Sequence, residues 1–241
     1  MSNGPVTGSS PKVLFFGMQS PFSLPSLTAL LDKAIDVRAV VMPANPMPGR
    51  ITPAIQRREA PGGRSVLPMA HASSQASIVS IAWRKKIPLW EVADLTHAET
   101  LTTLATYRPD MICVACFSLR IPRVLRELPL LGCLNVHPSL LPANRGPVPL
   151  FWTLREGHVS TGVTIHFIDE GMDSGDILAQ ERVMVPDGIS YTQLEAQCAV
   201  LGGALLAQTV CKLYQGNVTR LPQDEARASY YTFPTQEDLI V

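Results

Sequence analysis

The sequence has no excess of charge of either sign. Its 241 residues include 20 Lys or Arg and 20 Asp or Glu, so the formal net charge is zero. A neutral chain does not bind nucleic acid by bulk electrostatic attraction, although a local basic patch is compatible with this balance. The composition therefore argues against a general nucleic-acid-binding protein.

Long apolar runs are also missing. No stretch reaches about 18 consecutive apolar residues, the length of a membrane-spanning helix. The first ten residues are largely polar and contain glycine. From these absences we expect no signal peptide, no membrane span and a cytoplasmic protein, with residues 1–10 as a disordered N-terminus.

Cysteine is scarce, and the five cysteines lie scattered at positions 113, 116, 133, 198 and 211. Such a set suits a reducing compartment better than a disulfide framework. Cys113 and Cys116 have the Cys-x-x-Cys spacing, but they lie in an apolar run typical of a strand, where positions three apart face opposite sides. We interpret both as small buried hydrophobic residues and expect no metal site.

Strands alternate with helices along the chain. Residues 12–17 form an apolar run that ends in glycine, and Ser20 before Pro21 predicts the start of a helix that reaches residue 31. With a second strand at 35–42, this is the opening unit of a parallel sheet. The turn is not Gly-x-Gly-x-x-Gly, which disfavours a dinucleotide site. Further strands are expected at 88–92, 111–116, 131–136, 161–168 and 177–185, and further helices at 73–86, 96–107, 123–128 and 150–157 and from Ser190.

Residues 43–68 are rich in proline and carry Arg50, Arg57, Arg58 and Arg64 against a single acid, Glu59. A loop of this length inside a compact domain is either functional or disordered. One interpretation is a mobile basic lid that touches a phosphate-bearing acceptor. The other is a solvated, partly disordered insertion.

Polar residues end the strand at 131–136. Asn135 and His137 are separated by one apolar residue, so their side chains share one face of the strand. An amide can donate to an oxyanion, and an imidazole can exchange a proton near neutral pH, which is what acyl transfer needs. A carboxylate is the missing partner, and we assign Asp173 to this role. Asp169 and Glu170 in the same loop are rivals that spacing does not exclude.

The combined motif resembles a known family. Its parts are Asn135-x-His137, Ser139-Leu140-Leu141-Pro142, Arg145-Gly146-Pro147 with Pro149, Gly162-Val163-Thr164 and Asp169-x-Gly171-x-Asp173-x-Gly175. Together they resemble the 10-formyltetrahydrofolate-dependent formyltransferases, most closely the catalytic domain of the methionyl-tRNA formyltransferases. The resemblance covers about residues 12–215 and is strongest from 110 to 180. It assigns the catalytic asparagine, histidine and aspartate to Asn135, His137 and Asp173.

The resemblance also implies the architecture and the co-substrate. We expect a Rossmann-like α/β fold with a mostly parallel central sheet, helices on both faces, a catalytic domain at 11–215 and a tail at 216–241 packed on it. The co-substrate would be 10-formyltetrahydrofolate, with no metal. The expected folate-binding residues are Phe117, Leu119, Ile121, Ser139, Leu140, Leu141, Pro142, Ile168, Asp169 and Gly171.

The formyl acceptor is left open. The methionyl-tRNA formyltransferases carry a C-terminal barrel that helps to hold tRNA, whereas only a short tail follows residue 215 here, and that tail leans acidic. An amino sugar on a nucleotide, or another small amine, therefore competes with aminoacyl-tRNA as acceptor. Glycinamide ribonucleotide is a weaker candidate, because the N-terminal phosphate loop of the enzyme that formylates it is not recognisable in this sequence. A folate-binding module without turnover is the alternative of another class.

Aromatic residues and a second histidine complete the set of expectations. We expect Trp152 to pack in the core against the sheet. His166 is interpreted as a pocket wall or a partly buried structural histidine rather than a second catalytic base. Tyr230, Tyr231 and Phe233 in the tail are expected to dock on the domain, because exposing them together would leave apolar surface in water. A dimer through these aromatics is a further hypothesis.

Overall fold

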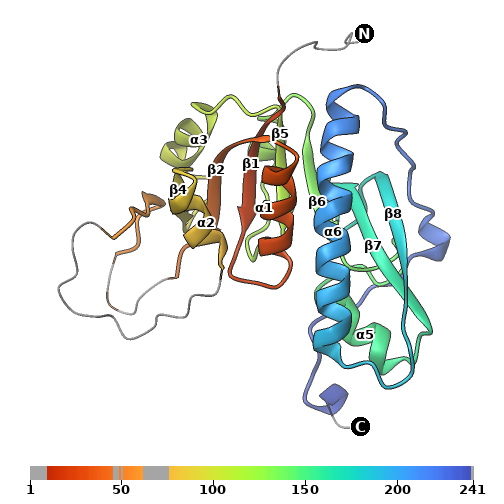
Figure 1. Ribbon diagram of the computed structural model, residues 1–241. Coiled ribbons are helices and arrows are strands. Elements are labelled where there is room, and N and C mark those ends of the chain that lie inside the picture. Colours follow the sequence, from red (N-terminus) through yellow and green to blue (C-terminus); the bar gives the residue numbers. More distant parts are fainter. Residues whose placement is uncertain (1–9, 46–48, 50, 62–75, 240–241) are drawn as a thin grey trace.

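The computed structural model describes residues 10–45, 49, 51–61 and 76–239, which include a single mixed sheet (Figure 1). The strand order is β3-β4-β2-β1-β5-β6-β7-β8. Residues 1–9, nearly all of the predicted N-terminal segment 1–10, lie outside the described residues. The strands are β1 (Lys12–Gly17), β2 (Asp36–Pro43), β3 (Ile55–Arg57), β4 (Leu89–Val92), β5 (Met111–Ala115), β6 (Cys133–His137), β7 (Ser160–Phe167) and β8 (Ile177–Met184).

The middle of the sheet is parallel. Strands β4, β2, β1, β5 and β6 run in the same direction, while β3 at one edge and β7 and β8 at the other run antiparallel to their neighbours. The predicted mostly parallel sheet is confirmed. The antiparallel β6–β7 pair was not predicted, and it determines which side chains meet at the end of β6.

Helices cover both faces of the sheet. Helices α1, α2, α5 and α6 contribute to one hydrophobic cluster, and α3 and α4 contribute to a second cluster on the opposite face. In β6, Leu134 and Val136 belong to the first cluster and Cys133 belongs to the second. Successive side chains of β6 therefore point to opposite faces of the sheet. The helices are α1 (Ser23–Asp32), α2 (Ile78–Arg84), α3 (Ala98–Ala105), α4 (Arg123–Arg126), α5 (Pro149–Arg155) and α6 (Tyr191–Tyr214), with short 3₁₀ turns at Glu225–Arg227 and Glu237–Leu239.

Helix α6 is the longest helix among the described residues, and it packs on α1 and β7. It is long and apolar enough to cross a membrane, but 56% of its most apolar window is buried inside the molecule. Two glycines allow this close packing. A Cβ at Gly203 would lie 2.7 Å from the backbone of Pro25 in α1, and one at Gly202 would lie 2.8 Å from Val136. The apolar character of α6 is thus accounted for by its contacts in the core.

The prediction of a continuous loop over 43–68 is wrong in part. Residues 55–57 form β3, which pairs antiparallel with β4 and closes that edge of the sheet. Arg58 forms a 2.7 Å ion pair with Glu91 of β4, and its carbonyl accepts a hydrogen bond from Trp83. Backbone pairing with β4 supplies hydrogen bonds that the local sequence could not reveal. Residues 62–68 lie outside the described residues.

Helix starts and one cysteine also differ from expectation. Helix α1 begins at Ser23, because the Ser20 hydroxyl accepts from the Ser23 amide in a turn that precedes the helix. Helix α2 is capped by Ser77, which accepts from the Ser80 amide, and residues 73–75 of the helix predicted at 73–86 lie outside the described residues. Cys113 is buried as predicted, whereas Cys116 is exposed, because β5 ends at Ala115 and Cys116 turns away with φ 57°.

The C-terminal segment runs back across the domain (Figure 1). Leu221 bridges to Ile177 of β8, and Tyr230 bridges to Arg145. Trp152 does not pack in the core as predicted. Its ring stacks on Tyr231 with a centroid distance of 4.7 Å, and its indole N–H donates to the Thr232 carbonyl. Trp152 instead packs against the C-terminal tail. Sequence periodicity cannot indicate this partner.

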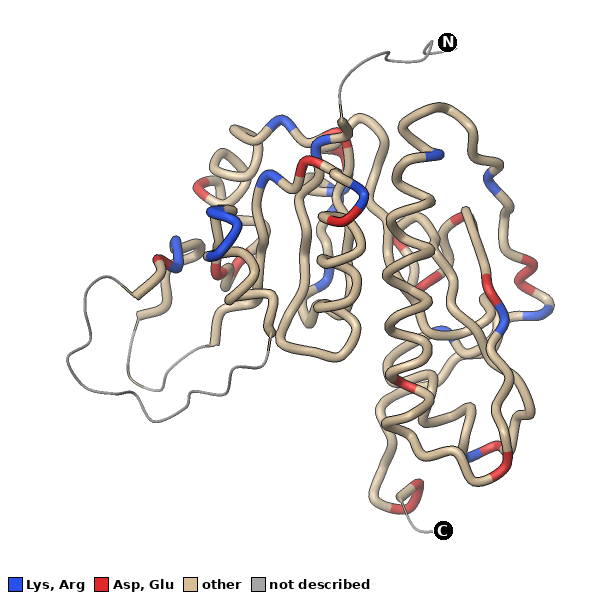
Figure 2. Tube along the Cα trace, in the orientation of Figure 1, with Lys and Arg blue, Asp and Glu red and all other residues tan. Residues whose placement is uncertain are grey.

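The tail aromatics do not behave alike. The Tyr231 ring is half-buried against Trp152, whereas Phe233 is 69% exposed and Tyr230 is 55% exposed. The expectation that they dock together is therefore wrong for Phe233. Figure 2 shows acidic and basic residues interspersed along this segment, consistent with its position on the surface.

Candidate functional site

The candidate site lies on β6 and β7, on the face opposite to α6. The antiparallel register places Asn135 opposite His166 and His137 opposite Thr164. Because alternate residues share a face, all four side chains point to the same side of the sheet. Sequence analysis identified the first strand of this pair but not the second strand as its partner.

Asn135 and His166 are joined by a hydrogen bond of 3.1 Å between Nδ2 and Nε2. His166 Nδ1 lies 2.8 Å from the Phe167 carbonyl oxygen, which can only accept, so Nδ1 carries the hydrogen and Nε2 is the acceptor. Burial lowers the pKa of His166 to about 4; the Asp173 carboxylate opposes this shift, and His137 adds to it. A neutral His166 therefore orients the Asn135 amide by accepting one of its two hydrogens.

Asp173 reaches the same point from a loop. Its Oδ1 lies 3.5 Å from Asn135 Nδ2, and its carboxylate oxygens lie 3.6 Å from His137 Nδ1 and 3.6 Å from His166 Nε2. The backbone amide of Gly146 donates to Asp173 Oδ2 at 2.9 Å. This carboxylate is thus fixed by the Gly146 backbone N–H and lies next to the Asn135 amide and two imidazoles.

The two rival carboxylates point elsewhere. Asp169 accepts from the Ser174 hydroxyl and from the Gly171 amide, which closes the loop on itself. Glu170 has a side chain that is 79% exposed and lies 3.7 Å from Arg126. Within the loop, Asp173 is therefore the carboxylate next to both histidines.

His137 is buried with 4% exposure. Its Nε2 lies 2.8 Å from the Asn144 carbonyl oxygen, and its Nδ1 faces Asp173. Since a carbonyl oxygen can only accept, Nε2 carries a hydrogen and donates it to Asn144, which fixes the ring with Nδ1 towards Asp173. Chemically, the site combines a fixed amide donor, an oriented imidazole and a carboxylate.

The residues predicted to bind folate fall into two groups. Phe117, Leu119, Ile121 and Ile168 contact the hydrophobic cluster of α3 and α4, and Phe117 lies edge-on to Phe16. Asp169 and Gly171 continue from Ile168 in the turn described above. Phe117, Leu119 and Ile121 follow the end of β5, whereas the Ile168 amide donates to the carbonyl of Cys133 at the start of β6.

The second group is the segment 139–142, which crosses the same face over β7. The Leu141 amide donates to the Thr164 hydroxyl, and Gln180 of β8 donates to the Leu141 carbonyl. These contacts place segment 139–142 against β7 and β8, whereas Phe117 and Leu119 follow β5. Ser139 is 1% exposed and donates to the Ala143 carbonyl, which makes it part of the turn.

A cavity of about 240 Å³ lies behind the turn that holds His137. It is lined by Ser139, Asn144, Glu156, Ser229, Tyr231 and neighbouring residues. The Tyr231 hydroxyl donates to Glu156, and this hydrogen bond together with burial raises the pKa of Tyr231 to about 12. Most residues that line the cavity have polar side chains, and several of them belong to the turn that holds His137.

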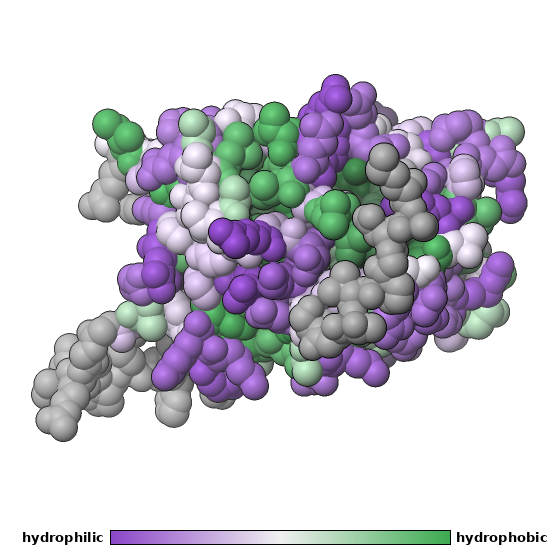
Figure 3. Space-filling model, turned by 90° about the horizontal axis from the view of Figure 1, so that it is seen from above, coloured by the Kyte–Doolittle hydropathy of each residue, from purple (hydrophilic) through white to green (hydrophobic). Residues whose placement is uncertain are grey.

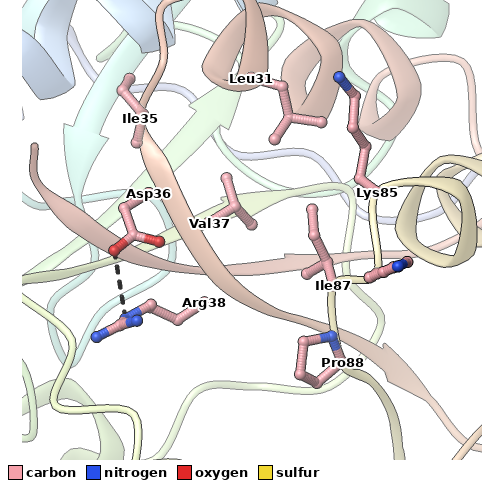
Figure 4. A pocket seen from close by; sticks show the side chains of 9 residues that line it. Leu31, Ile35, Asp36, Val37, Arg38, Lys85, Ile87 and Pro88 are labelled. Atoms are coloured by element: carbon pink, nitrogen blue, oxygen red, sulfur yellow. Dashed lines mark ion pairs between the residues drawn. The ribbon is translucent and has the colours of Figure 1, made fainter.

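A second cavity of about 380 Å³ lies far from this chemistry, at the amino-terminal ends of β2 and β4 (Figure 4). Its apolar floor includes Val37 and Ile87, and Arg38 at its rim is paired with Asp36. From that end of the molecule, hydrophilic residues surround small apolar patches (Figure 3). Neither catalytic candidates nor predicted folate contacts line this cavity.

Among the described residues, no cluster of three or more His, Cys, Asp or Glu side chains has the arrangement of a metal site. The site residue that sequence analysis underestimated is His166, which is 1% exposed and touches both Asn135 and Asp173. Its position on the polar face of its strand was readable. Its partner was not, because the antiparallel register is a tertiary feature.

Comparison with known proteins identifies the family. The formyl transferase family model matches residues 50–210. A methionyl-tRNA formyltransferase of Syntrophomonas wolfei is 35% identical over 231 residues, covering 95% of this chain and 67% of the relative. The chain belongs to the formyl transferase family and is a formyl-transferring enzyme by class.

A second relative gives a similar match. A methionyl-tRNA formyltransferase of Syntrophus aciditrophicus is 34% identical and covers 95% of this chain and 67% of that protein. This chain spans about two thirds of the length of such relatives, 67% and 65% in two of them.

Solved structures support the fold. Glycinamide ribonucleotide transformylase 1 of Symbiobacterium toebii has a TM-score of 0.68 at 18% identity, covering 89% of this chain and 95% of that one. An N-formyltransferase of Helicobacter canadensis, solved with folinic acid and dTDP-3-aminofucose, has a TM-score of 0.65 at 18% identity, covering 95% of this chain and 72% of that one. The predicted Rossmann-like formyltransferase fold is thus confirmed.

Proposed function

We propose that this protein transfers the formyl group of 10-formyltetrahydrofolate to a primary amine. The observation that carries the proposal is the convergence of the Asn135 amide and two imidazoles on the Asp173 carboxylate, each within 3.6 Å of one of its oxygens. A binding site without turnover has no use for this combination, whereas acyl transfer requires an oxyanion donor and an acid–base group.

Asn135 is the oxyanion donor. One of its amide hydrogens is held by His166, and the other faces Asp173 Oδ1 at 3.5 Å, which is a weak contact. The oxygen of the formyl group can replace that contact as negative charge develops on it. The His137 imidazole lies beside the same position, held by its hydrogen bond to the Asn144 carbonyl.

Asp173 accepts the proton of the amine and then donates it to the folate. As the amine nitrogen bonds to the formyl carbon, its proton passes to the carboxylate, directly or through a water molecule. The same proton then moves to the folate nitrogen when the bond from that nitrogen to the formyl carbon breaks. The Gly146 amide keeps Oδ2 in place, and His137 Nδ1 lies 3.6 Å from the same oxygen.

The folate donor is proposed to lie across the edge of β5 and β6. Phe117, Leu119 and Ile168 supply apolar surface, and backbone groups of 169–171 supply donors and acceptors for a flat heterocycle. Segment 139–142 lies on the other side of the polar groups and closes the site there. We propose that Ser139, Leu140, Leu141 and Pro142 contact the folate from that side.

The proposed acceptor is the amino group of methionyl-tRNA, in line with the 35% identical relative. A small amine such as a nucleotide-linked amino sugar is the second candidate. The acidic tail favours it, because Asp224, Glu225, Glu237 and Asp238 outnumber the basic Arg220 and Arg227 there and would repel a phosphate backbone. We place the reaction in the cytoplasm and retain a dimer through the exposed Tyr230 and Phe233 as a hypothesis.

The experiment measures consumption of 10-formyltetrahydrofolate with methionyl-tRNA or with amino-sugar nucleotides. Consumption that depends on an amine supports formyl transfer, and the amine that is used identifies the acceptor. Folate binding without transfer to any acceptor would favour the non-catalytic module. If tRNA is the acceptor, its binding must weaken steeply as salt is raised.

A further inference from the structure

Arg145 is a buried cation outside the groups that carry the proposed reaction. Its side chain is 0% exposed, and its guanidinium donates to both carboxylate oxygens of Glu225 at 2.9 and 2.7 Å. It also donates twice to Gln223 Oε1, from Nε at 3.0 Å and from Nη2 at 2.8 Å. A buried charge is tolerated only when it is fully paired. Arg145 therefore fixes the Gln223 amide in one orientation, with its oxygen facing the guanidinium.

The other end of the Gln223 amide reaches the catalytic loop. Its Nε2 donates to the carbonyl oxygens of Asp173 and Gly175, each at 2.8 Å. Asp173 has φ 53°, in the left-handed region that non-glycine residues rarely adopt. Such a conformation persists only where the surroundings hold it. Two hydrogen bonds from one side chain, on either side of this turn, provide that hold.

A second connection joins the same partners. Gly146, next to Arg145, donates its amide to Asp173 Oδ2 at 2.9 Å. The tail fixes this pair of residues through its backbone, because the Arg145 amide donates to the Ser229 carbonyl and the Tyr231 amide donates to the Arg145 carbonyl. Gly146 has φ 102°, and a Cβ there would lie 2.1 Å from the Tyr231 carbonyl oxygen. The tail thus supports both the backbone and the carboxylate of Asp173.

We propose that Gln223 is a positioning residue for Asp173. It holds the 173–175 turn so that the carboxylate stays against Asn135 and His137, while Arg145 keeps its amide in the donating orientation. The segment around residue 223 then positions the catalytic turn and does not merely pack on the surface of the domain. This inference rests on the proposed function, since it assigns Asp173 a role in formyl transfer.

The test separates the two ends of the Gln223 amide. Gln223→Glu keeps an oxygen for Arg145 but replaces the donors with an acceptor that faces two carbonyls. Gln223→Met has a similar length and removes both functions. The matched controls are Gln236→Glu and Gln236→Met, which change an exposed tail glutamine.

The expected result is a kcat about tenfold or more below wild type in both Gln223 variants, with the KM for the folate within about twofold, because small misplacements of a catalytic group are costly. The control variants keep wild-type values. A wild-type kcat in Gln223→Glu overturns the proposal, because the two donated hydrogen bonds would then be irrelevant. A loss confined to Gln223→Met also overturns it, because pairing with Arg145 would then suffice.

Amide hydrogen exchange gives a readout that does not need activity. In Gln223→Glu the Gly146 amide, which donates to Asp173, should exchange about tenfold faster, while amides of β5 keep their rates. Unchanged exchange at Gly146 contradicts the positioning role. If wild-type protein transfers no formyl group and Gly146 still responds, the proposed function fails and the positioning of Asp173 stands.

Discussion

Asn135 and His166 lie 31 residues apart in the chain, yet the Asn135 Nδ2 and His166 Nε2 atoms are 3.1 Å apart across the β6–β7 pair. The contact fixes the direction of the Asn135 amide. A protonated His166 would offer a hydrogen where an acceptor is needed, so the site depends on this histidine staying neutral. Burial, which lowers the pKa of His166 to about 4, maintains that state at neutral pH.

Replacing Asn135 with alanine should reduce formyl-transfer turnover by about 10²–10³-fold, because an oxyanion donor is lost. Asp173→Ala should also abolish most of the turnover. Folate affinity and the thermal midpoint should change little, because the Asn135 side chain lies at the edge of the core. Steady-state kinetics and a folate-binding titration measure these effects. Asn217→Ala, at an exposed position, is the control, and undiminished turnover in either site variant would remove the assignment.

His166 makes stability depend on pH in a defined window. Its pKa is lowered from 6.5 to about 4 on folding, so the unfolded chain binds more protons between these values. The free energy of unfolding should therefore fall as pH drops from 6.5 to 4, by up to about 1.4 kcal/mol per pH unit from this residue. Above pH 6.5 the contribution is fully present. Urea unfolding curves of wild type and His166→Gln, recorded at several pH values, measure this contribution. An equal pH dependence of the free energy of unfolding in both proteins would refute it.

Gly203 lies where α6 meets α1, and its missing side chain is required. Alanine there would place a Cβ 2.7 Å from the Pro25 backbone, so we expect a loss of about 1–3 kcal/mol in the free energy of unfolding. Helix propensity alone predicts the opposite sign, a gain of about 1 kcal/mol. Chemical denaturation decides the sign. Gln208→Ala, at an exposed position of the same helix, should be nearly neutral, and a stabilised Gly203→Ala would contradict the packing argument.

The cysteines should react in an order set by burial. Cys116 is exposed and should be alkylated first in the native protein, whereas burial raises the pKa of Cys133 and of Cys198 to about 12 and also raises that of Cys113. Peptide mass spectrometry after brief treatment with iodoacetamide measures the order. In denaturant all the cysteines should react, which serves as the control. Equal labelling of Cys113 and Cys116 in the native state would contradict the structure.

Some of the site was readable because its chemistry is local. The alternation of Asn135, Val136 and His137 puts the amide and the imidazole on one face of any strand, whatever its neighbours. The glycine-containing loop around Asp173 was recognisable from composition and from the family motif. The alternation of strands with helices likewise indicated a parallel sheet before any pairing was known.

Other features depend on contacts between distant segments. Gln223 and Asp173 are joined by a hydrogen bond although they lie 50 residues apart in the chain, and Arg145 and Glu225 are paired although they lie 80 residues apart. No periodicity in the chain encodes such pairs. Trp152 illustrates the same limit, because an apolar ring at a helix start has the same pattern whether it faces a core or a tail.

The sequence by itself determined the family, the parallel core and the residue types that can perform formyl transfer, since these follow from local patterns of apolar and polar side chains. The tertiary structure alone decided that β7 runs antiparallel beside β6, that His166 is buried and neutral between Asn135 and Asp173, and that the tail supports the catalytic turn. The physical reason is that register, burial and paired charges arise from segments that meet only in the folded chain.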